Sequence, residues 1–236
     1  MSLREARDLS GTRLVFSSGS AVLDRILGSG LRTGEMVEVF GASGTGKTQL
    51  AIQCALSAAS AGYSCAYVDT EGQFRPERLA SICESRGLDT AKILPLVYCI
   101  RADDTPQQEG AIGMVNENEM LKGCRFVAID TVTKNFTLEF SGSRSVVSRQ
   151  TALGAYLNRL ARDAFLHDRA VLLLNRVASV GFEGEVREVG IGGETLRHFV
   201  QKSVWLQKRG AKVCASLAGK QGTEEVAMGI SIRGLE

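Results

Sequence analysis

The sequence predicts an α/β domain in which a mostly parallel central sheet is flanked by helices, with an antiparallel extension near the C-terminus. Two observations favour this class. Short apolar, β-branched or aromatic runs alternate with longer segments of helical pattern, and the C-terminal part holds strand-like runs without helices between them. At 236 residues the chain can form one substantial core, so we expect a single domain.

The elements can be placed in order along the chain. Parallel strands are expected at residues 36–40, 64–68, 96–100, 126–129 and 170–174, and helices at residues 49–61, 76–86, 106–121 and 147–167. A glycine-rich stretch follows over residues 177–193. Strand-like runs come last, at residues 203–207, 212–216 and 226–232. We expect these runs to extend the sheet, the first two being joined by a turn at Arg209-Gly210.

Charge and composition exclude some classes of protein. The net charge of +2 is nearly balanced, so composition argues neither for nor against nucleic acid as a partner. No run suits a membrane span, and residues 1–15 are charged, which predicts a short helix or a solvated arm before a core domain of residues 16–236. The six cysteines are scattered without a C-x-x-C pair and indicate reduced, mostly buried thiols. We therefore expect a cytoplasmic protein without a membrane partner.

A glycine-rich octapeptide between the first strand and the first helix of this alternation has the phosphate-binding form G-x-x-x-x-G-K-[ST]. It consists of Gly41, Ala42, Ser43, Gly44, Thr45, Gly46, Lys47 and Thr48, with Gln49 next in the helix. In such a loop the backbone N–H groups and the helix N-terminus face phosphate oxygens. Lys47 would reach the β- and γ-phosphates and Thr48 would hold Mg²⁺, so the motif predicts a nucleoside triphosphate, ATP, with Mg²⁺.

Polar residues also follow three other strands of the predicted sheet, and ligands of open parallel sheets bind at that edge. The strand at 64–68 leads into Asp69-Thr70-Glu71-Gly72, the strand at 126–129 into Asp130-Thr131, and the strand at 170–174 into Asn175-Arg176. Asp130 is suited to hold Mg²⁺ through water, and Glu71 could orient or deprotonate the attacking water. Without this context, a carboxylate after a strand is as often a turn residue.

Residues 69–79, Asp-Thr-Glu-Gly-Gln-Phe-Arg-Pro-Glu-Arg-Leu, resemble the D-T-E-G-x-F-R-P-E-R-L motif of the archaeal and eukaryotic RecA-like recombinases. Further similarities are Ser18-Gly19-Ser20 before the octapeptide, Phe140-Ser141-Gly142 after Asp130, and Ile191-Gly192-Gly193. The resemblance spans about residues 15 to 236 and is greatest to the short archaeal paralogue RadB. It implies a RecA-like P-loop NTPase fold.

The resemblance also implies roles for particular residues. Glu71 and Lys47 would be catalytic, Arg78 would stack on adenine, and His198 would lie near the nucleotide of a neighbouring subunit. Residues 139–149 and 178–190 would be two DNA-binding loops, and Lys134, Arg144 and Arg149 would contact DNA. Without the resemblance His198 reads equally well as an ordinary, partly buried histidine, and each loop arginine as a solvated charge.

The chain departs from the family pattern in three ways. It begins after the family's helical N-terminal domain and filament linker, which puts self-polymerisation in doubt. The family's Asn-Gln step is Asn175-Arg176, where an arginine could pair with phosphate or with Glu71 but cannot accept a hydrogen bond. Residues 177–193 carry a net charge of −2, from three glutamates against one arginine, which opposes a phosphate backbone.

These features predict an ATP-binding, weakly hydrolysing protein of homologous recombination and DNA repair. It would bind single-stranded DNA, with double-stranded DNA as a further candidate, and act as an accessory or mediator of a main RadA-type recombinase or of another paralogue. Two alternatives stay open. One is a self-assembling strand-exchange recombinase, which would form homo-oligomers. The other is an ATP-switched interaction protein of the RecA/KaiC-like group that does not bind DNA.

Overall fold

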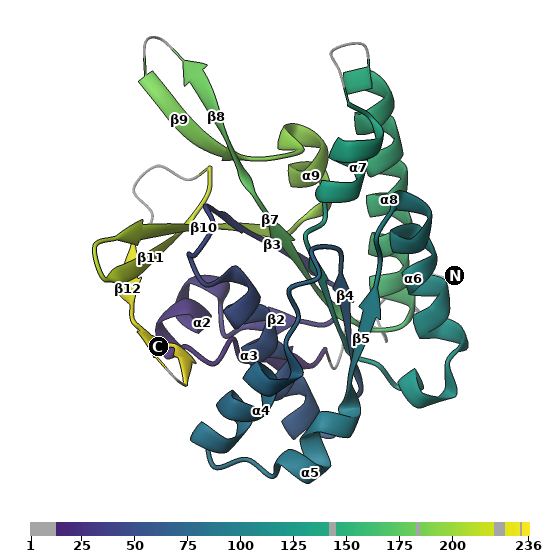
Figure 1. Ribbon diagram of the computed structural model, residues 1–236, viewed down its shortest axis with the longest axis vertical. Coiled ribbons are helices and arrows are strands. Elements are labelled where there is room, and N and C mark those ends of the chain that lie inside the picture. The colour runs from purple at the N-terminus through teal and green to yellow at the C-terminus, as the bar shows by residue number, and fades with distance from the viewer. Residues whose placement is uncertain (1–12, 142–144, 183–184, 220–224, 232) are drawn as a thin grey trace.

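An eight-stranded sheet forms the centre of the molecule (Figure 1). The computed structural model describes residues 13–141, 145–182, 185–219, 225–231 and 233–236. The strand order is β12-β11-β10-β3-β7-β6-β4-β5. Five strands in the positions predicted from the sequence run parallel: β3 (Met36–Gly41), β7 (Ala170–Asn175), β6 (Phe126–Asp130), β4 (Cys65–Asp69) and β5 (Val97–Arg101). The predicted mostly parallel sheet is confirmed.

The C-terminal extension is antiparallel only in its outer part. β10 (Lys202–Arg209) pairs with β3 in parallel, and β11 (Lys212–Leu217) and β12 (Val226–Met228) then add antiparallel strands. The single strand predicted at 226–232 is wrong, because the chain leaves the sheet at Gly229 and forms a separate small hairpin. This hairpin consists of β13 (Ile230–Ser231) and β14 (Gly234–Leu235).

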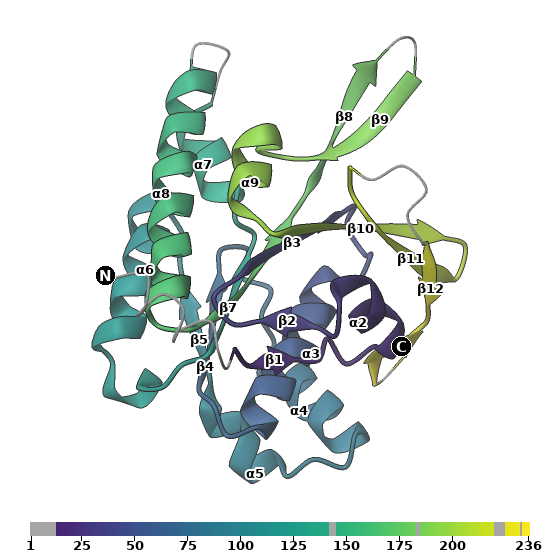
Figure 2. The same ribbon diagram turned by 180° about the vertical axis from the view of Figure 1, so that it is seen from behind.

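Helices cover both faces of the sheet (Figures 1 and 2). One face carries α2 (Ala21–Leu27), α3 (Lys47–Ser60), α4 (Pro76–Ser85) and the short α5 (Thr90–Ile93), and the other carries α6 (Thr105–Glu117), α7 (Lys134–Glu139), α8 (Val146–Leu166) and α9 (Gly193–Phe199). Alternate residues of a central strand point to the two layers: Phe126 and Ala128 belong to one apolar cluster, and Val127 and Ile129 to the other. Burial on both faces explains why these strands are continuous apolar runs.

Several predicted boundaries shift in the structure. The helix predicted at 106–121 ends at Glu117, and a 3-10 turn (Glu119–Leu121) follows it after Asn118. Within the stretch 177–193 the chain forms an antiparallel hairpin, β8 (Val177–Phe182) with β9 (Glu185–Gly190), in place of an open loop. The hairpin projects from the same end of the molecule as the start of α8 (Figures 1 and 2).

Residues 15–32 pack against one face of the sheet through Phe16, Leu23, Leu27 and Leu31. β1 (Val15–Phe16) pairs with β2 (Leu31–Arg32), and the predicted arm at 1–15 falls outside the described residues up to residue 12.

All six cysteines are free thiols and five are buried, as predicted, while Cys99 is exposed on the edge strand β5. No helix in the described part of the chain combines the length and apolar character that crossing a membrane requires.

Candidate active site

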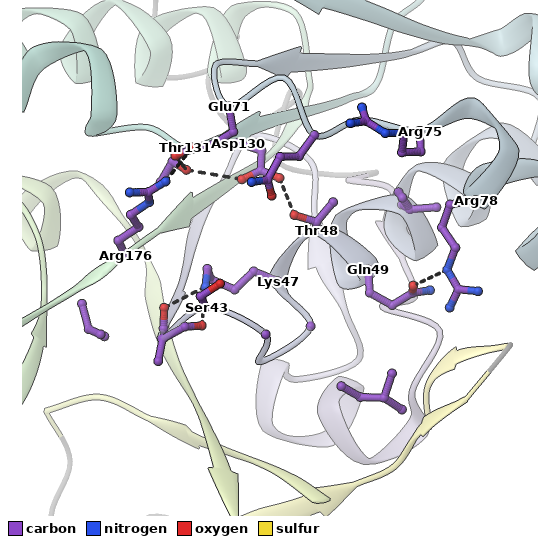
Figure 3. A pocket seen from close by; sticks show the side chains of 18 residues that line it. Ser43, Lys47, Thr48, Gln49, Glu71, Arg75, Arg78, Asp130, Thr131 and Arg176 are labelled. Atoms are coloured by element: carbon purple, nitrogen blue, oxygen red, sulfur yellow. Dashed lines mark hydrogen bonds and ion pairs between the residues drawn. The ribbon is translucent and has the colours of Figure 1, made fainter. Parts of the chain in front are cut away.

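A cavity of about 690 Å³ opens at the carboxyl ends of the parallel strands (Figure 3). It is lined by the octapeptide and the start of α3, by residues that follow β4, β6 and β7, and by one residue of β13. Every residue predicted to contact nucleotide lines it except Thr45, whose buried hydroxyl donates to the Ala42 carbonyl at 2.9 Å. Gln73, Arg75, Thr131, Val177, Ile52 and Ile230 line it as well and were not predicted.

Glycines shape the loop at the floor of the cavity. Gly44 and Gly46 have φ values of 77° and 88°, the left-handed region that favours glycine, and Gly46 caps the N-terminus of α3. A Cβ at Gly41 would come within 2.4 Å of the Leu206 carbonyl oxygen on β10. The sequence motif therefore reflects backbone geometry, which leaves the start of α3 facing the cavity.

Lys47 is folded back onto this loop. Its Nζ donates to the carbonyl oxygens of Gly41 at 2.7 Å and Ala42 at 2.8 Å. Burial lowers the pKa of Lys47 from its ordinary value, and the nearby negative charge of Asp130 opposes that shift. The ammonium is thus held over the loop, at the place where phosphate oxygens would compete for it.

Three oxygen-bearing side chains meet at the end of β6. The Thr48 hydroxyl donates to Asp130 Oδ2 at 2.6 Å, and the Tyr67 hydroxyl donates to the same oxygen at 2.5 Å. Burial raises the pKa of Asp130, while these two donors act in the opposite direction. A hydroxyl and a carboxylate in contact are hard oxygen ligands, so the donor set fits Mg²⁺. Because few protein ligands gather here, phosphate oxygens and water would complete the coordination.

Glu71 is held from two sides (Figure 3). The Thr131 hydroxyl donates to its Oε1 at 2.8 Å, and Arg176 Nη2 lies 2.5 Å from its Oε2. The Glu71 side chain is 9% exposed, whereas that of Arg176 is 56% exposed. Of the two pairings that the sequence allowed for Arg176, the structure shows the one with Glu71.

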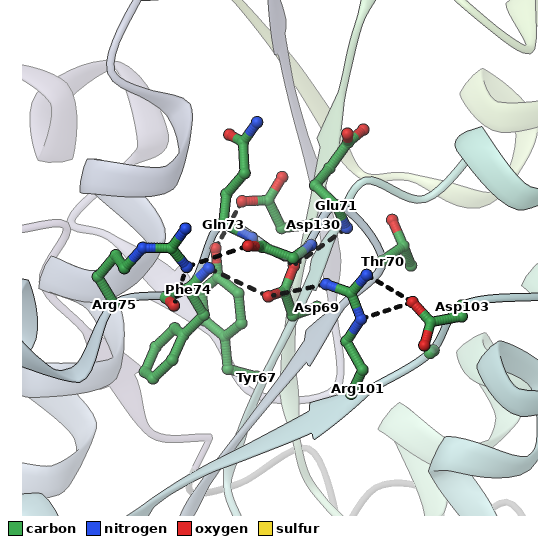
Figure 4. A network of polar contacts seen from close by, with 12 residues as sticks. Tyr67, Asp69, Thr70, Glu71, Gln73, Phe74, Arg75, Arg101, Asp103 and Asp130 are labelled. Atoms are coloured by element: carbon green, nitrogen blue, oxygen red, sulfur yellow. Dashed lines mark hydrogen bonds and ion pairs between the residues drawn. The ribbon is translucent and has the colours of Figure 1, made fainter.

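The loop that carries Glu71 is fixed by a residue that sequence analysis did not single out (Figure 4). Asp69 Oδ1 accepts from the backbone N–H groups of Glu71 at 3.0 Å, Gly72 at 2.7 Å and Gln73 at 3.3 Å. Its Oδ2 accepts from Phe74 N at 3.0 Å and lies 3.6 Å from Arg101 Nη1. An aspartate directly before a Thr-Glu-Gly turn is the sequence pattern that could have predicted these bonds from backbone N–H groups to Asp69.

The far end of the cavity combines an arginine with the C-terminal hairpin. Arg78 Nε donates to Gln49 Oε1 at 2.8 Å, and its Nη2 donates to the Ser231 carbonyl oxygen at 3.1 Å. Gln53 fixes β14 on α3 with two bonds, one from its Nε2 to the Leu235 carbonyl at 3.1 Å and one from Leu235 N at 2.9 Å. The hairpin that supplies Ile230 to the wall of the cavity is therefore fixed to Arg78 and to α3.

A buried junction ties β7 to the β8–β9 hairpin. Asn175 Nδ2 donates to Glu38 Oε1 at 2.8 Å and to the Ile191 carbonyl at 2.6 Å. Its Oδ1 accepts from the Thr133 hydroxyl at 2.8 Å and from Arg176 N at 2.9 Å. The hairpin is thereby fixed at both of its ends to the edge of the sheet that carries the cavity.

The residues predicted to bind DNA and a neighbouring subunit lie apart from one another. The Lys134 ammonium donates to the carbonyl oxygen of Thr70, the residue directly before Glu71. Arg149 is half-buried in the first turn of α8, and Arg144 is outside the described residues. His198 is exposed on α9, with its ring centroid 5.2 Å from that of Phe199.

Comparison with known proteins adds evidence that is independent of this geometry. The profile of the family described as Rad51 matches residues 11–234. The chain is 34% identical over 204 residues to the DNA repair and recombination protein RadA of Metallosphaera sedula, covering 81% of this chain and 62% of that protein. It is 31% identical over 204 residues to the protein of the same description from Cenarchaeum symbiosum, covering 83% of this chain and 51% of that protein. The chain thus spans less than two thirds of the length of either relative.

Proposed function

The chain belongs to the Rad51 family, and from that premise we propose that it binds ATP with Mg²⁺ in the cavity and hydrolyses it slowly. We further propose that it acts in homologous recombination and DNA repair as a DNA-binding accessory or mediator of a main RadA-type recombinase. The two similar proteins are described as DNA repair and recombination proteins, which supports this field of action. Similarity to the short paralogue RadB, inferred from sequence motifs, supports the accessory role.

The observation that carries the ATP proposal is the convergence of independent segments on one cavity. Lys47 and Thr48 come from the loop after β3, Glu71 from the turn after β4, and Asp130 from the end of β6. Each supplies a group that phosphoryl transfer to water uses: a cation for phosphate, oxygen ligands for a metal ion, and a carboxylate for water. A glycine-rich turn with only a structural role would not need these partners.

The chemistry follows from the positions of these groups. The oxygen of a water molecule oriented by Glu71 bonds to the γ-phosphorus while the bond to the β–γ bridging oxygen breaks, and ADP leaves with that oxygen. The proton of the water passes to Glu71 or to the released phosphate. Mg²⁺ bound by Thr48 and Asp130 would neutralise phosphate charge. Lys47 would exchange its two loop carbonyls for the β- and γ-phosphates.

The DNA part of the proposal rests on the end of the molecule from which two segments project. The β8–β9 hairpin and the N-terminal end of α8 both project there (Figures 1 and 2). They contain parts of the two segments that the family resemblance assigns to DNA binding. Lys134, Arg144 and Arg149 are the proposed contacts, and His198 is the proposed contact with a neighbouring subunit.

A second candidate function is an ATP-switched protein that binds protein partners and no DNA. One observation favours it: the Lys134 ammonium donates to the Thr70 carbonyl oxygen inside the molecule, so a contact with a DNA phosphate would require this bond to break. The acidic composition of the stretch 177–193 acts in the same direction.

Replacement of the loop lysine tests the ATP proposal. We expect Lys47→Ala to weaken Mg-ATP binding by at least tenfold, roughly the contribution of one charge-assisted contact to phosphate. The matched control is Lys122→Ala, because Lys122 is an exposed lysine paired only weakly with Glu119 at 3.6 Å. Equilibrium binding of a fluorescent ATP analogue measures both variants. Equal affinity of Lys47→Ala and the unmodified protein would remove the basis for an ATP site.

A further inference from the structure

Cationic side chains line the cavity at two ends, and they differ in how they are engaged (Figure 3). Arg75 donates to the carbonyl oxygens of Gly72 and Phe74, and Arg78 donates to Gln49 and Ser231. Lys47 and Arg176 line the end formed by the glycine-rich loop and Glu71. These two are the lining cations of the described cavity that are placed to meet a terminal phosphate.

Arg176 has a fixed backbone and a side chain that can move. Its backbone N–H donates to Asn175 Oδ1 at 2.9 Å, and its carbonyl accepts from Ile191 N at 3.0 Å. Its side chain is 56% exposed and reaches across to Glu71. The guanidinium can therefore change partner without any change in the sheet, because only side-chain torsions need to rotate.

The charges favour such a change when a triphosphate enters. An ion pair with an exposed partner is weak. A phosphate carries more negative charge than one carboxylate, and it also offers two acceptor oxygens that match the guanidinium fork. The stronger attraction to the phosphate acts to move Arg176 from Glu71 to the γ-phosphate.

We propose that Arg176 is a catalytic residue that this chain supplies to its own γ-phosphate. Without nucleotide it pairs with Glu71. With ATP bound, its guanidinium binds the γ-phosphate oxygens, stabilises the charge of the transferring group, and frees Glu71 to orient the water whose oxygen displaces ADP. This inference rests on the proposed ATP function. It adds that hydrolysis needs no cation from a second subunit.

Nucleotide binding with and without a γ-phosphate mimic is the first test. We expect Arg176→Ala to bind ADP within about twofold of the unmodified protein, but to bind ADP with beryllium fluoride and Mg²⁺ at least tenfold more weakly. Arg176→Lys should recover part of this affinity, since it keeps the charge and loses the fork. The control is Arg159→Ala, which removes an exposed arginine paired with Glu109 on the helical face.

Turnover gives the second readout. An arginine acting on the γ-phosphate contributes roughly 10³ to 10⁵ in kcat in other nucleotide hydrolases, so we expect at least a hundredfold loss in Arg176→Ala. The rate per chain of the unmodified protein should stay constant on dilution into the range where light scattering shows monomers.

Three results would overturn the inference: equal affinity of Arg176→Ala for both nucleotide states, a kcat that is unchanged or higher in that variant, or a rate per chain that falls on dilution. The failure of the wider ATP proposal is distinguishable, because in that case the unmodified protein and Lys47→Ala would bind Mg-ATP equally.

Discussion

At the scale of single residues, Asp69 determines where Glu71 lies. One carboxylate accepts from four successive backbone N–H groups, those of residues 71 to 74, and so fixes the turn that carries Glu71, the proposed catalytic carboxylate. Gly72 occupies the left-handed region in this turn, with φ of 72°, and Arg101 packs beneath it. The turn is therefore set by Asp69 and by the backbone, and it places the carboxylate of Glu71 at the cavity.

Asp69→Asn tests this role. Asparagine keeps one acceptor oxygen but places an amide where Oδ2 accepts from Phe74, so we expect the free energy of unfolding to fall by roughly 1 to 3 kcal/mol. Turnover should fall as well, with ATP affinity nearly unchanged, because Glu71 moves and the phosphate loop does not. Denaturant unfolding and phosphate release measure the two effects. The control is Asp103→Asn, which changes the exposed partner of Arg101 and should behave as the unmodified protein. Equal effects of the two variants would refute the role of Asp69 in fixing the turn.

The buried Glu38 predicts a pH dependence of stability. Burial raises its pKa above the ordinary value of 4.5, and hydrogen bonds from Asn175 and Ser203 oppose the shift. Between 4.5 and the raised value the unfolded chain has lost this proton and the folded chain keeps it, so stability falls as pH rises through that window.

We therefore expect Glu38→Gln to gain stability relative to the unmodified protein as pH rises from about 4.5 to 8. The gain is about 1.4 kcal/mol for each pH unit by which folding raises the pKa. Urea unfolding of both proteins across this range measures the difference between their free energies of unfolding at each pH. Other titrating groups contribute equally to both proteins, so their contribution cancels in this difference. A difference that does not vary with pH would show that Glu38 titrates normally in the folded protein.

At the scale of elements, the C-terminal hairpin β13–β14 supports the glycine-rich loop of residues 41–48 from outside. Leu235 is fully buried, and its side chain lies where a Cβ at Gly46 would meet it at 3.1 Å. Gln53 holds Leu235 through both backbone groups. The hairpin, α3 and the loop therefore form one unit, although residues 46 and 235 are far apart in sequence.

Gln53→Ala tests this unit. The substitution leaves a buried N–H and a buried carbonyl without partners, so we expect a loss of roughly 1 to 3 kcal/mol in the free energy of unfolding. We also expect weaker ATP binding, because Ile230, which lines the cavity, and Ser231, whose carbonyl accepts from Arg78, lose their support. Gln107→Ala, at an exposed glutamine of α6, is the control. Unaltered ATP affinity in a destabilised Gln53→Ala protein would separate the hairpin from the site.

The same elements show what a sequence can predict and why some features escape it. The central strands are buried on both faces, so each is a continuous apolar run that ends at a polar residue, and their ends are predictable to within about two residues. The phosphate loop is predictable because its glycines answer local backbone requirements. The bonds from Gln53 to Leu235 and from Asn175 to Glu38 were not predicted, because they join residues far apart in sequence whose relative positions only the folded chain defines.

The hairpin β8–β9 was not predicted for a different reason. Its segment is rich in glycine and glutamate, which lowers strand propensity, and its strands pair with each other outside the main sheet. In the C-terminal run, Gly229 separates two strands that belong to different sheets, and a continuous apolar pattern conceals the break. Both outcomes depend on which strands pair with each other, and a local sequence pattern does not contain that information.

At the scale of the whole molecule, the sheet brings the cavity proposed for ATP and the proposed DNA surface into one structure. The cavity lies at the carboxyl ends of the parallel strands, as in other open α/β sheets. Asn175 then fastens the β8–β9 hairpin to the strand beside the cavity. A change at Arg176 on binding of ATP would therefore act next to the base of the projecting hairpin.

Binding of single-stranded DNA tests the proposed surface. Three phosphate contacts, by Lys134, Arg144 and Arg149, would give a slope of roughly −2 for log affinity against log salt concentration, and Arg149→Ala should reduce that slope by about 0.7. Titration of a labelled oligonucleotide between low and high salt, with Arg159→Ala as control, measures the slope. No binding at low salt would favour the ATP-switched interaction protein.

The central claim is that the edge of the sheet binds the triphosphate of ATP, and a crystal structure with Mg²⁺ and a non-hydrolysable ATP analogue tests it most directly. We expect the γ-phosphate between Lys47 and Arg176, with the metal ion beside Thr48 and Asp130 and with Glu71 released from the guanidinium. A nucleotide bound elsewhere, or an empty cavity at saturating analogue with the Glu71–Arg176 pair intact, would contradict it.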